Sequence, residues 1–245
     1  MKYLTTVMIM VLLAGTGCRK ETSLPARRVE GEISGLKKGS LRLGVLRNGK
    51  PRFIDSIEIK GEGKFLFDLK TIPPQMMILQ LREKPSDYAL FFAGDSVTQV
   101  YTSLQKFGTD IRVKGDTNTR LWVDYYRMIR RFNDKELELI RDKWEASRSK
   151  DTAAAHKLEK ELTGLQKRRK LYALNFALTH ADLPVGAYAA YTEFYANPVI
   201  LDTVYKSLSP AVKKSYYGKE IARQVDSLQS MQSSANSDEQ PISQS

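Results

Sequence analysis

The sequence predicts an α+β protein in which an antiparallel β-sandwich or small barrel is followed by an all-helical domain. Between residues 28 and 115, apolar residues recur near every second position, and glycine-centred turns separate the runs. From residue 116 onward the apolar period lengthens to three or four residues, which is typical of amphipathic helices. We therefore expect a β-domain over residues 28–115 and a helical domain over residues 116–229.

The β-domain is expected to contain seven or eight short strands. Asn48-Gly49 predicts a tight hairpin, because both residues accept a positive φ, and Gly61-Glu62-Gly63-Lys64 predicts a second reversal. Even spacing of short strands favours a sandwich or a small barrel. In chain order the predicted strands cover residues 29–33, 41–45, 53–59, 65–67, 76–81, 88–92, 97–102 and 111–113.

The helical domain is expected to open with a long antiparallel hairpin whose polar turn lies at residues 147–152. Asp116 or Thr117 is suited to cap the first arm. Shorter helices are expected at residues 185–196, 199–207 and 210–229, followed by a disordered polar tail at residues 230–245. The predicted apolar stripes are Trp122, Tyr126, Ile129, Leu137, Ile140 and Trp144 on the first arm, and Leu158, Leu162, Leu165, Tyr172 and Phe176 on the second.

The N-terminus has the pattern of an export signal. Lys2 precedes an apolar run that is too short to span a bilayer, and small residues follow before Cys18, the only cysteine. Residues 1–17 resemble a bacterial lipoprotein signal peptide, which implies acylation of Cys18 and a lipidated tether over residues 18–27. We expect an exported lipoprotein of the cell membrane or outer membrane, facing the periplasm or the surface. The alternative is an ordinary cleavable signal peptide with an incidental cysteine.

The formal charge of +11 suggests anionic partners, such as lipid head groups, lipopolysaccharide phosphates or acidic envelope polymers. Nucleic acid is a poor candidate in the predicted compartment. If the hairpin turns near residue 150, position 130 lies opposite position 170, so two basic clusters would form one patch. The alternative is that these residues only keep the arms soluble. The residues are Arg127, Arg130, Arg131, Lys167, Arg168, Arg169 and Lys170.

Catalytic motifs are weak. Gly94-Asp95-Ser96-Val97 resembles the nucleophile block of the Gly-Asp-Ser-Leu serine esterases, but neither His156 nor His180 has their Asp three positions earlier, so we expect a turn. Neither histidine has metal ligands at suitable spacing, and no cofactor motif is present, so we expect no metal site, no cofactor and no enzymatic activity. A hydrolase with a dispersed site is the alternative.

The β-domain contains five turn and core motifs, Gly31-x-Ile33-x-Gly35-Leu36, Asp55-Ser56, Gly61-x-Gly63-Lys64-Phe65-x-Phe67, Phe91-Phe92-x-Gly94-Asp95 and Val113-x-Gly115. Together they resemble an uncharacterised β-rich domain at the N-terminus of thioredoxin-like and peroxiredoxin-like bacterial lipoproteins. The stretches His180 to Tyr188 and Lys214 to Lys219 resemble the segment that links this domain to the thioredoxin fold in those proteins. The resemblance implies a β-rich fold and an accessory role beside a thiol oxidoreductase. In those relatives a Cys-x-x-Cys domain follows, whereas this chain has only Cys18 and therefore lacks the redox pair.

These observations lead us to expect a lipid-anchored envelope protein that acts as a non-catalytic binding or scaffold module. Its expected partners are the membrane, through the anchor, and an envelope protein such as a thiol oxidoreductase. The first alternative is a binder of anionic lipid, lipopolysaccharide or envelope polymer that uses the basic helical hairpin. It predicts salt-sensitive binding that is weakened by charge reversal at Arg130 and Arg168.

Overall fold

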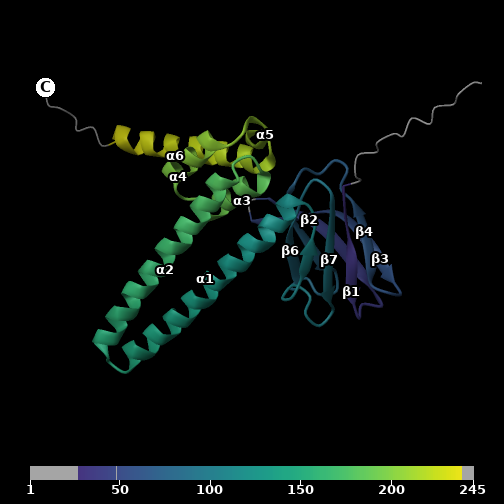
Figure 1. Cartoon of the computed structure of the whole chain (residues 1–245), viewed down its shortest axis with the longest axis horizontal. Coiled ribbons are helices and arrows are strands. Elements are labelled where there is room, and N and C mark those ends of the chain that lie inside the picture. The colour runs from purple at the N-terminus through teal and green to yellow at the C-terminus, as the bar shows by residue number, and fades with distance from the viewer. Residues whose placement is uncertain (1–26, 48, 239–245) are drawn as a thin grey trace, which may run out of the picture.

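The computed structural model describes residues 27–47 and 49–238, which form a β-domain followed by a helical domain (Figure 1). The predicted signal peptide, Cys18 and residues 18–26 of the predicted tether lie outside the described residues. Eight strands are present at the predicted positions. They are β1 (Arg28–Ser34), β2 (Lys38–Arg47), β3 (Lys50–Lys60), β4 (Lys64–Asp68), β5 (Gln75–Leu81), β6 (Tyr88–Ala93), β7 (Val97–Ser103) and β8 (Arg112–Lys114).

The strands form two four-stranded sheets, in the orders β4-β1-β7-β8 and β3-β2-β5-β6, instead of one closed barrel. Neighbouring strands are antiparallel except β1 and β7, which run parallel from Arg28 opposite Val97 to Ser34 opposite Ser103. The expectation of purely antiparallel pairing is therefore wrong at this pair. The chain between β1 and β7 builds the second sheet and β4, which provides the long connection that a parallel pair requires.

Glycines make the predicted turns between strands. Arg47 pairs with Lys50 across the hairpin between β2 and β3, where Gly49 has a φ of 73°; Asn48 lies outside the described residues. Gly63 also has a φ of 73°, and a Cβ there would lie 2.3 Å from the carbonyl oxygen of Ile33. Both positions therefore favour glycine, as the sequence predicts.

Residues from both sheets form one apolar core that continues into the helical domain. Phe67 and Phe91 are fully buried in the β-domain, and Trp122 and Ile221 carry the core into the helices. Strand β5 is buried along its whole length, which explains its nearly continuous apolar sequence.

Six helices follow the sheets. They are α1 (Thr117–Arg148), α2 (Thr152–Thr179), α3 (Pro184–Glu193), α4 (Pro198–Ser207), α5 (Pro210–Lys213) and α6 (Tyr216–Asp238). Helices α1 and α2 form the predicted antiparallel hairpin, which projects away from the sheets, while α3 to α6 gather near its base (Figure 1). No helix within residues 27–47 and 49–238 has both the length and the hydropathy needed to cross a membrane.

Aromatic and ionic contacts hold the two arms of the hairpin together. Tyr125 of α1 stacks on Tyr172 of α2, with ring centroids 5.8 Å apart. Farther out, Gln166 donates to Glu136 at 2.8 Å, and Lys143 pairs with Glu159 near the tip. The arms therefore stay in contact from the base to the last turns.

The predicted apolar stripe of α1 is only partly buried. Trp122 and Ile129 are buried, but Leu137, Ile140 and Trp144 are 67%, 46% and 61% exposed. These three side chains belong to the predicted apolar face but are not covered. At that distance from the sheets, the edge of α1 that carries Leu139 faces α2, and no third helix or strand of residues 27–47 and 49–238 covers the opposite side.

The C-terminal helices differ from the prediction in two places. The predicted helix over residues 210–229 is divided into α5 and α6, since Ser215 accepts from the backbone N–H of Gly218 and so starts a new helix. Helix α6 then continues to Asp238, so residues 230–238 of the predicted disordered tail are helical. That segment contains no glycine or proline to end the helix. Residues 239–245 lie outside the described residues.

A tyrosine ties α6 to the β-domain. The hydroxyl of buried Tyr217 accepts a hydrogen bond of 3.2 Å from the backbone N–H of Met76 on β5. We expect Tyr217→Phe to lower the free energy of unfolding by about 1–2 kcal/mol, because this buried N–H would lose its partner. Chemical denaturation measures the difference.

Tyr216→Phe is the matched control for this prediction. Its ring lies under the guanidinium of Arg47, and its hydroxyl makes no hydrogen bond to a described residue. We expect a change of less than about 0.5 kcal/mol for Tyr216→Phe. Equal losses for the two variants would show that the Tyr217 hydrogen bond contributes nothing.

Candidate functional site

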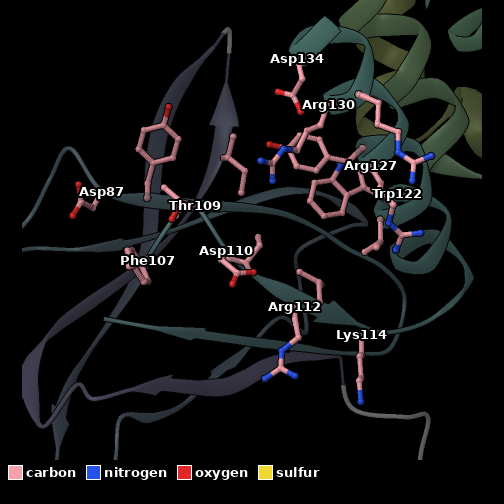
Figure 2. A pocket seen from close by; sticks show the side chains of 18 of the residues that line it. Asp87, Phe107, Thr109, Asp110, Arg112, Lys114, Trp122, Arg127, Arg130 and Asp134 are labelled. Carbon is pink, nitrogen blue, oxygen red and sulfur yellow. The ribbon is translucent and has the colours of Figure 1, made fainter. Parts of the chain in front are cut away.

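A concave site lies where the β-domain meets the first turns of α1. It is an open cleft of about 870 Å³, bounded on one side by β8 and by the loops at residues 86–88 and 107–111, and on the other by α1 (Figure 2). This volume is in the range of small-molecule sites in proteins. The cleft is therefore the candidate binding site of this chain.

Aromatic side chains form the apolar part of the cleft. Trp122 is buried and stacks on Tyr126, with centroids 5.1 Å apart and an interplanar angle of 11°. Tyr126 is 40% exposed, and Tyr88 across the cleft is 47% exposed. These accessible faces are suited to pack against a ring of a ligand.

Cations outnumber carboxylates in the cleft lining. The cations are Arg112, Lys114, Arg127, Arg130 and Arg131, and the carboxylates are Asp87, Asp110 and Asp134. Of these, Arg127 pairs with Asp124 at 3.0 Å and Asp110 pairs with Lys106 at 3.8 Å. Within the described part of the chain, Arg112, Lys114, Arg130 and Arg131 make no ion pair. The cleft therefore carries positive charge that the protein does not neutralise.

The root of α1 fixes one wall of the cleft to the β-domain. Asp116 caps α1: its carboxylate accepts from the N–H of Thr119 at 3.1 Å and from the N–H of Asp95 in the turn after β6. Gly94 leaves room for this carboxylate, because a Cβ there would lie 2.0 Å from it. The hydroxyl of Thr119 donates to the carbonyl of Phe92 at 3.1 Å.

A second contact joins the first turn of α1 to α3. The side chain of Asn118, which is buried, accepts from the N–H of Val185 at 3.2 Å. Arg27 also binds the turn between β6 and β7, where it donates to the carbonyl of Gly94 at 2.8 Å. Burial raises the pKa of the Asp95 carboxyl in this turn, against the attraction of the Arg27 charge, which lowers it. Polar contacts with the end of β6, with the turn after it and with α3 thus fix the start of α1, the helix that carries the cleft arginines.

The Gly94-Asp95-Ser96 motif is a turn between β6 and β7, as predicted from the sequence. His180 lies at the C-terminal cap of α2 with its ring against Phe176, and His156 is exposed near the distal end of the hairpin. Ser96 therefore has no histidine base among the described residues. In the same part of the chain, no group of three or more His, Cys, Asp or Glu side chains is arranged to hold a metal ion.

The structure divides the two basic clusters that the sequence predicts as one patch. Arg127, Arg130 and Arg131 line the cleft. Arg169 lies between helices instead, where it pairs with Glu193 at 3.1 Å and Glu136 at 3.8 Å. Lys167 and Lys170 line a separate apolar groove of about 350 Å³ beside α4, and Arg168 is exposed on α2.

The β-domain wall of the cleft is missing from the sequence prediction. Arg112 and Lys114 alternate with Val113 on β8, which in the sequence is a short strand like any other. Tyr88 and Asp110 have no spacing relation to the arginines of α1. Only the packing of α1 against β6 and β8 brings these groups together.

Comparison with known proteins gives one match. Residues 28–122 match the model of a family described as a domain of unknown function (DUF4369). The chain contains a DUF4369 domain. No curated protein and no solved structure matches the chain significantly. The resemblance inferred from the sequence is therefore supported as a domain of unknown function, while its link to thioredoxin-like lipoproteins has no support from relatives.

The end of the DUF4369 domain at residue 122 agrees with the structure, since the first turns of α1 complete the β-domain through Asp116, Thr119 and Trp122. The predicted boundary at residue 115 excluded these turns. The DUF4369 domain supplies β8, the loops and Trp122 to the cleft, whereas the three arginines of α1 lie beyond its last residue. The candidate site thus lies on the border between the domain and the helical extension.

Proposed function

We propose that this protein is an exported, lipid-anchored and non-catalytic binding module whose cleft takes an anionic saccharide. The observation that carries the proposal is the pairing of accessible tyrosine faces with four cations that lack an ion pair in the described structure. Aromatic faces pack against sugar rings, and guanidinium groups bind carboxylate, phosphate or sulfate groups in a bidentate manner. A cleft also suits a chain-like ligand better than the flat surface of a bilayer.

Binding is tested with a heparin-derived tetrasaccharide as the anionic probe and maltotetraose as the uncharged one. We expect calorimetry to detect binding of the anionic probe that weakens as salt is added, and none of maltotetraose. Arg130→Glu and Arg112→Glu are each expected to weaken binding about tenfold, since each replaces an attraction with a repulsion. Equal affinity for the two probes would contradict the proposal.

Two control variants separate the cleft from the hairpin as a whole. Lys157→Glu makes the same charge change on an exposed part of α2, and Arg168→Glu changes the basic cluster that lies outside the cleft. We expect both to bind the probe within about twofold of the wild type. If Arg168→Glu weakens binding as much as Arg130→Glu, the site is the basic hairpin surface and not the cleft.

The anchor is part of the proposal, and its support is the sequence pattern at residues 1–18. We expect mass spectrometry of the N-terminal peptide from a bacterial host to show Cys18 as the first residue, carrying acyl chains. Cys18→Ser is expected to move the protein from the membrane fraction to the soluble fraction. A mature N-terminus at another residue, or an unmodified Cys18 thiol, would contradict this assignment. The proposed partnership with a thiol oxidoreductase has only the family resemblance as its support.

A further inference from the structure

The outer half of α1 carries an apolar stripe that the described part of the chain leaves exposed. Leu137, Ile140 and Trp144 are all at least 46% exposed, and their spacing of three and four residues places them on one side of the helix. Leu139, by contrast, is 4% exposed, so the stripe lies outside the contact with α2. Soluble proteins rarely expose several large apolar side chains side by side. Such a surface is typical of an interaction site.

The spacing of the stripe is that of a coiled-coil seam. Positions 137, 140 and 144 follow the alternation of three and four residues that lets a second helix pack along the first. Asp134, Arg141 and Arg148 are seven residues apart and therefore form one flank of this seam. Asp134 and Arg148 make no ion pair among the described residues, and the guanidinium of Arg148 lies over the Trp144 ring, 5.6 Å from its centroid. Arg141 pairs with Asp142 at 3.2 Å.

We propose that two copies of this chain associate through this seam, with α1 packed antiparallel on α1 of the second copy. A two-fold axis near residue 141 brings Asp134 of each copy opposite Arg148 of the other, and sets Ile140 against Trp144 of the second copy. The charges on this flank are thus complementary to those on the same flank of an antiparallel second copy. The like charges that meet at Arg141 are offset by Asp142 of the same chain.

The charges favour a second copy over a different partner or a bilayer. The flank offers one acidic and one basic group at equal distances from its centre, whereas a surface made for anionic lipid would be basic throughout. Three apolar side chains from each copy make a small interface, so we expect a micromolar dissociation constant. The two-dimensional confinement of a lipid-anchored chain would raise the local concentration of copies.

Analytical ultracentrifugation of the full chain carrying Cys18→Ser tests the dimer. We expect a reversible dimer, and an increase of at least about tenfold in the dissociation constant for the double variant Ile140→Gln, Trp144→Gln. The control is Leu171→Gln, which removes an apolar side chain that is 50% exposed on α2 and outside the stripe; it should leave the dissociation constant unchanged. A wild-type chain that stays monomeric at about 100 µM, or a dimer that the double variant leaves intact, would overturn the proposal.

A charge exchange tests the direction of packing. Asp134→Arg and Arg148→Asp should each weaken the dimer, and the two together should restore it, because the double variant re-forms the pair with the signs reversed. Restoration is expected only for the antiparallel arrangement, so two additive losses would overturn the proposed packing. Sedimentation is measured without the probe, so the result reports on the dimer alone. Asp134 lines the cleft, whereas Ile140 and Trp144 do not, so it is the apolar double variant that separates the dimer from saccharide binding.

Discussion

Replacing Gly31 by alanine is expected to lower the free energy of unfolding by at least about 3 kcal/mol, or to prevent folding altogether. Gly31 lies in β1 at the centre of its sheet, opposite Val100 in the parallel β1–β7 pair. A Cβ at this position would lie 1.8 Å from the carbonyl oxygen of Val100. Because that oxygen belongs to a paired strand, it cannot move away without breaking the register. Thermal and chemical denaturation, together with the soluble yield, measure the effect.

Gly164→Ala is the control, since it makes the same chemical change with the opposite expected sign. Gly164 lies within α2, where the nearest atom to a new Cβ is the flexible end of Arg168 at 3.4 Å. Alanine favours a helix over glycine by up to about 1 kcal/mol, so this variant should be more stable than the wild type. If Gly31→Ala proves as stable as Gly164→Ala, β1 and β7 do not approach each other as closely as the structure has them.

Raising the pH above 10 is expected to unfold the protein cooperatively, through its buried tyrosines. Burial raises the pKa of Tyr188 to about 12, and it raises the pKa of Tyr217 well above its usual value of 10.0. The two rings lie edge to face, 5.2 Å apart, at the junction of the domains. In the unfolded chain both hydroxyls would ionise near pH 10.

The sign of this dependence follows from proton linkage. The folded state keeps its tyrosine protons above pH 10 while the unfolded state releases them, so stability is complete below pH 10 and falls as the pH rises toward 12. Raising the pKa of Tyr188 from 10.0 to about 12 corresponds to about 3 kcal/mol of stability. We expect tyrosinate absorbance and loss of circular dichroism to change in one transition. Tyr188→Phe should make the free energy of unfolding less dependent on pH above pH 10. Ionisation of Tyr188 and Tyr217 without unfolding would refute the explanation.

The strands and the hairpin were predictable because their signals are local. Alternation of apolar residues sets the eight strands, and glycines mark the reversals at Gly49 and Gly63. The cap of α1 was likewise visible, since an acidic residue before a helical run can accept from the first free N–H groups. Each of these features depends on residues within a few positions of one another.

Pairing and exposure were less predictable. The parallel β1–β7 pair joins strands that are far apart in the chain, and no local pattern specifies which strands meet. The apolar stripe of α1 has the same period whether it is buried or not, so Ile129 and Trp144 looked alike in the sequence although only Ile129 is covered. The basic residues were recognisable in the sequence, but the sequence did not show which side of each helix they occupy.

The sequence by itself determined the α+β class, the order of strands and helices, the turns and the net positive charge, because composition and periodicity specify these directly. Only the tertiary structure decided where the charge gathers. The contact of α1 with β6 and β8 brings three arginines close to the basic residues of β8 and to the aromatic side chains of the cleft. Arg169, although its neighbours in the sequence are exposed cations, is paired with Glu193 between helices. The physical reason is that a site is made by groups that are close in space, and closeness between distant segments depends on the packing of whole elements.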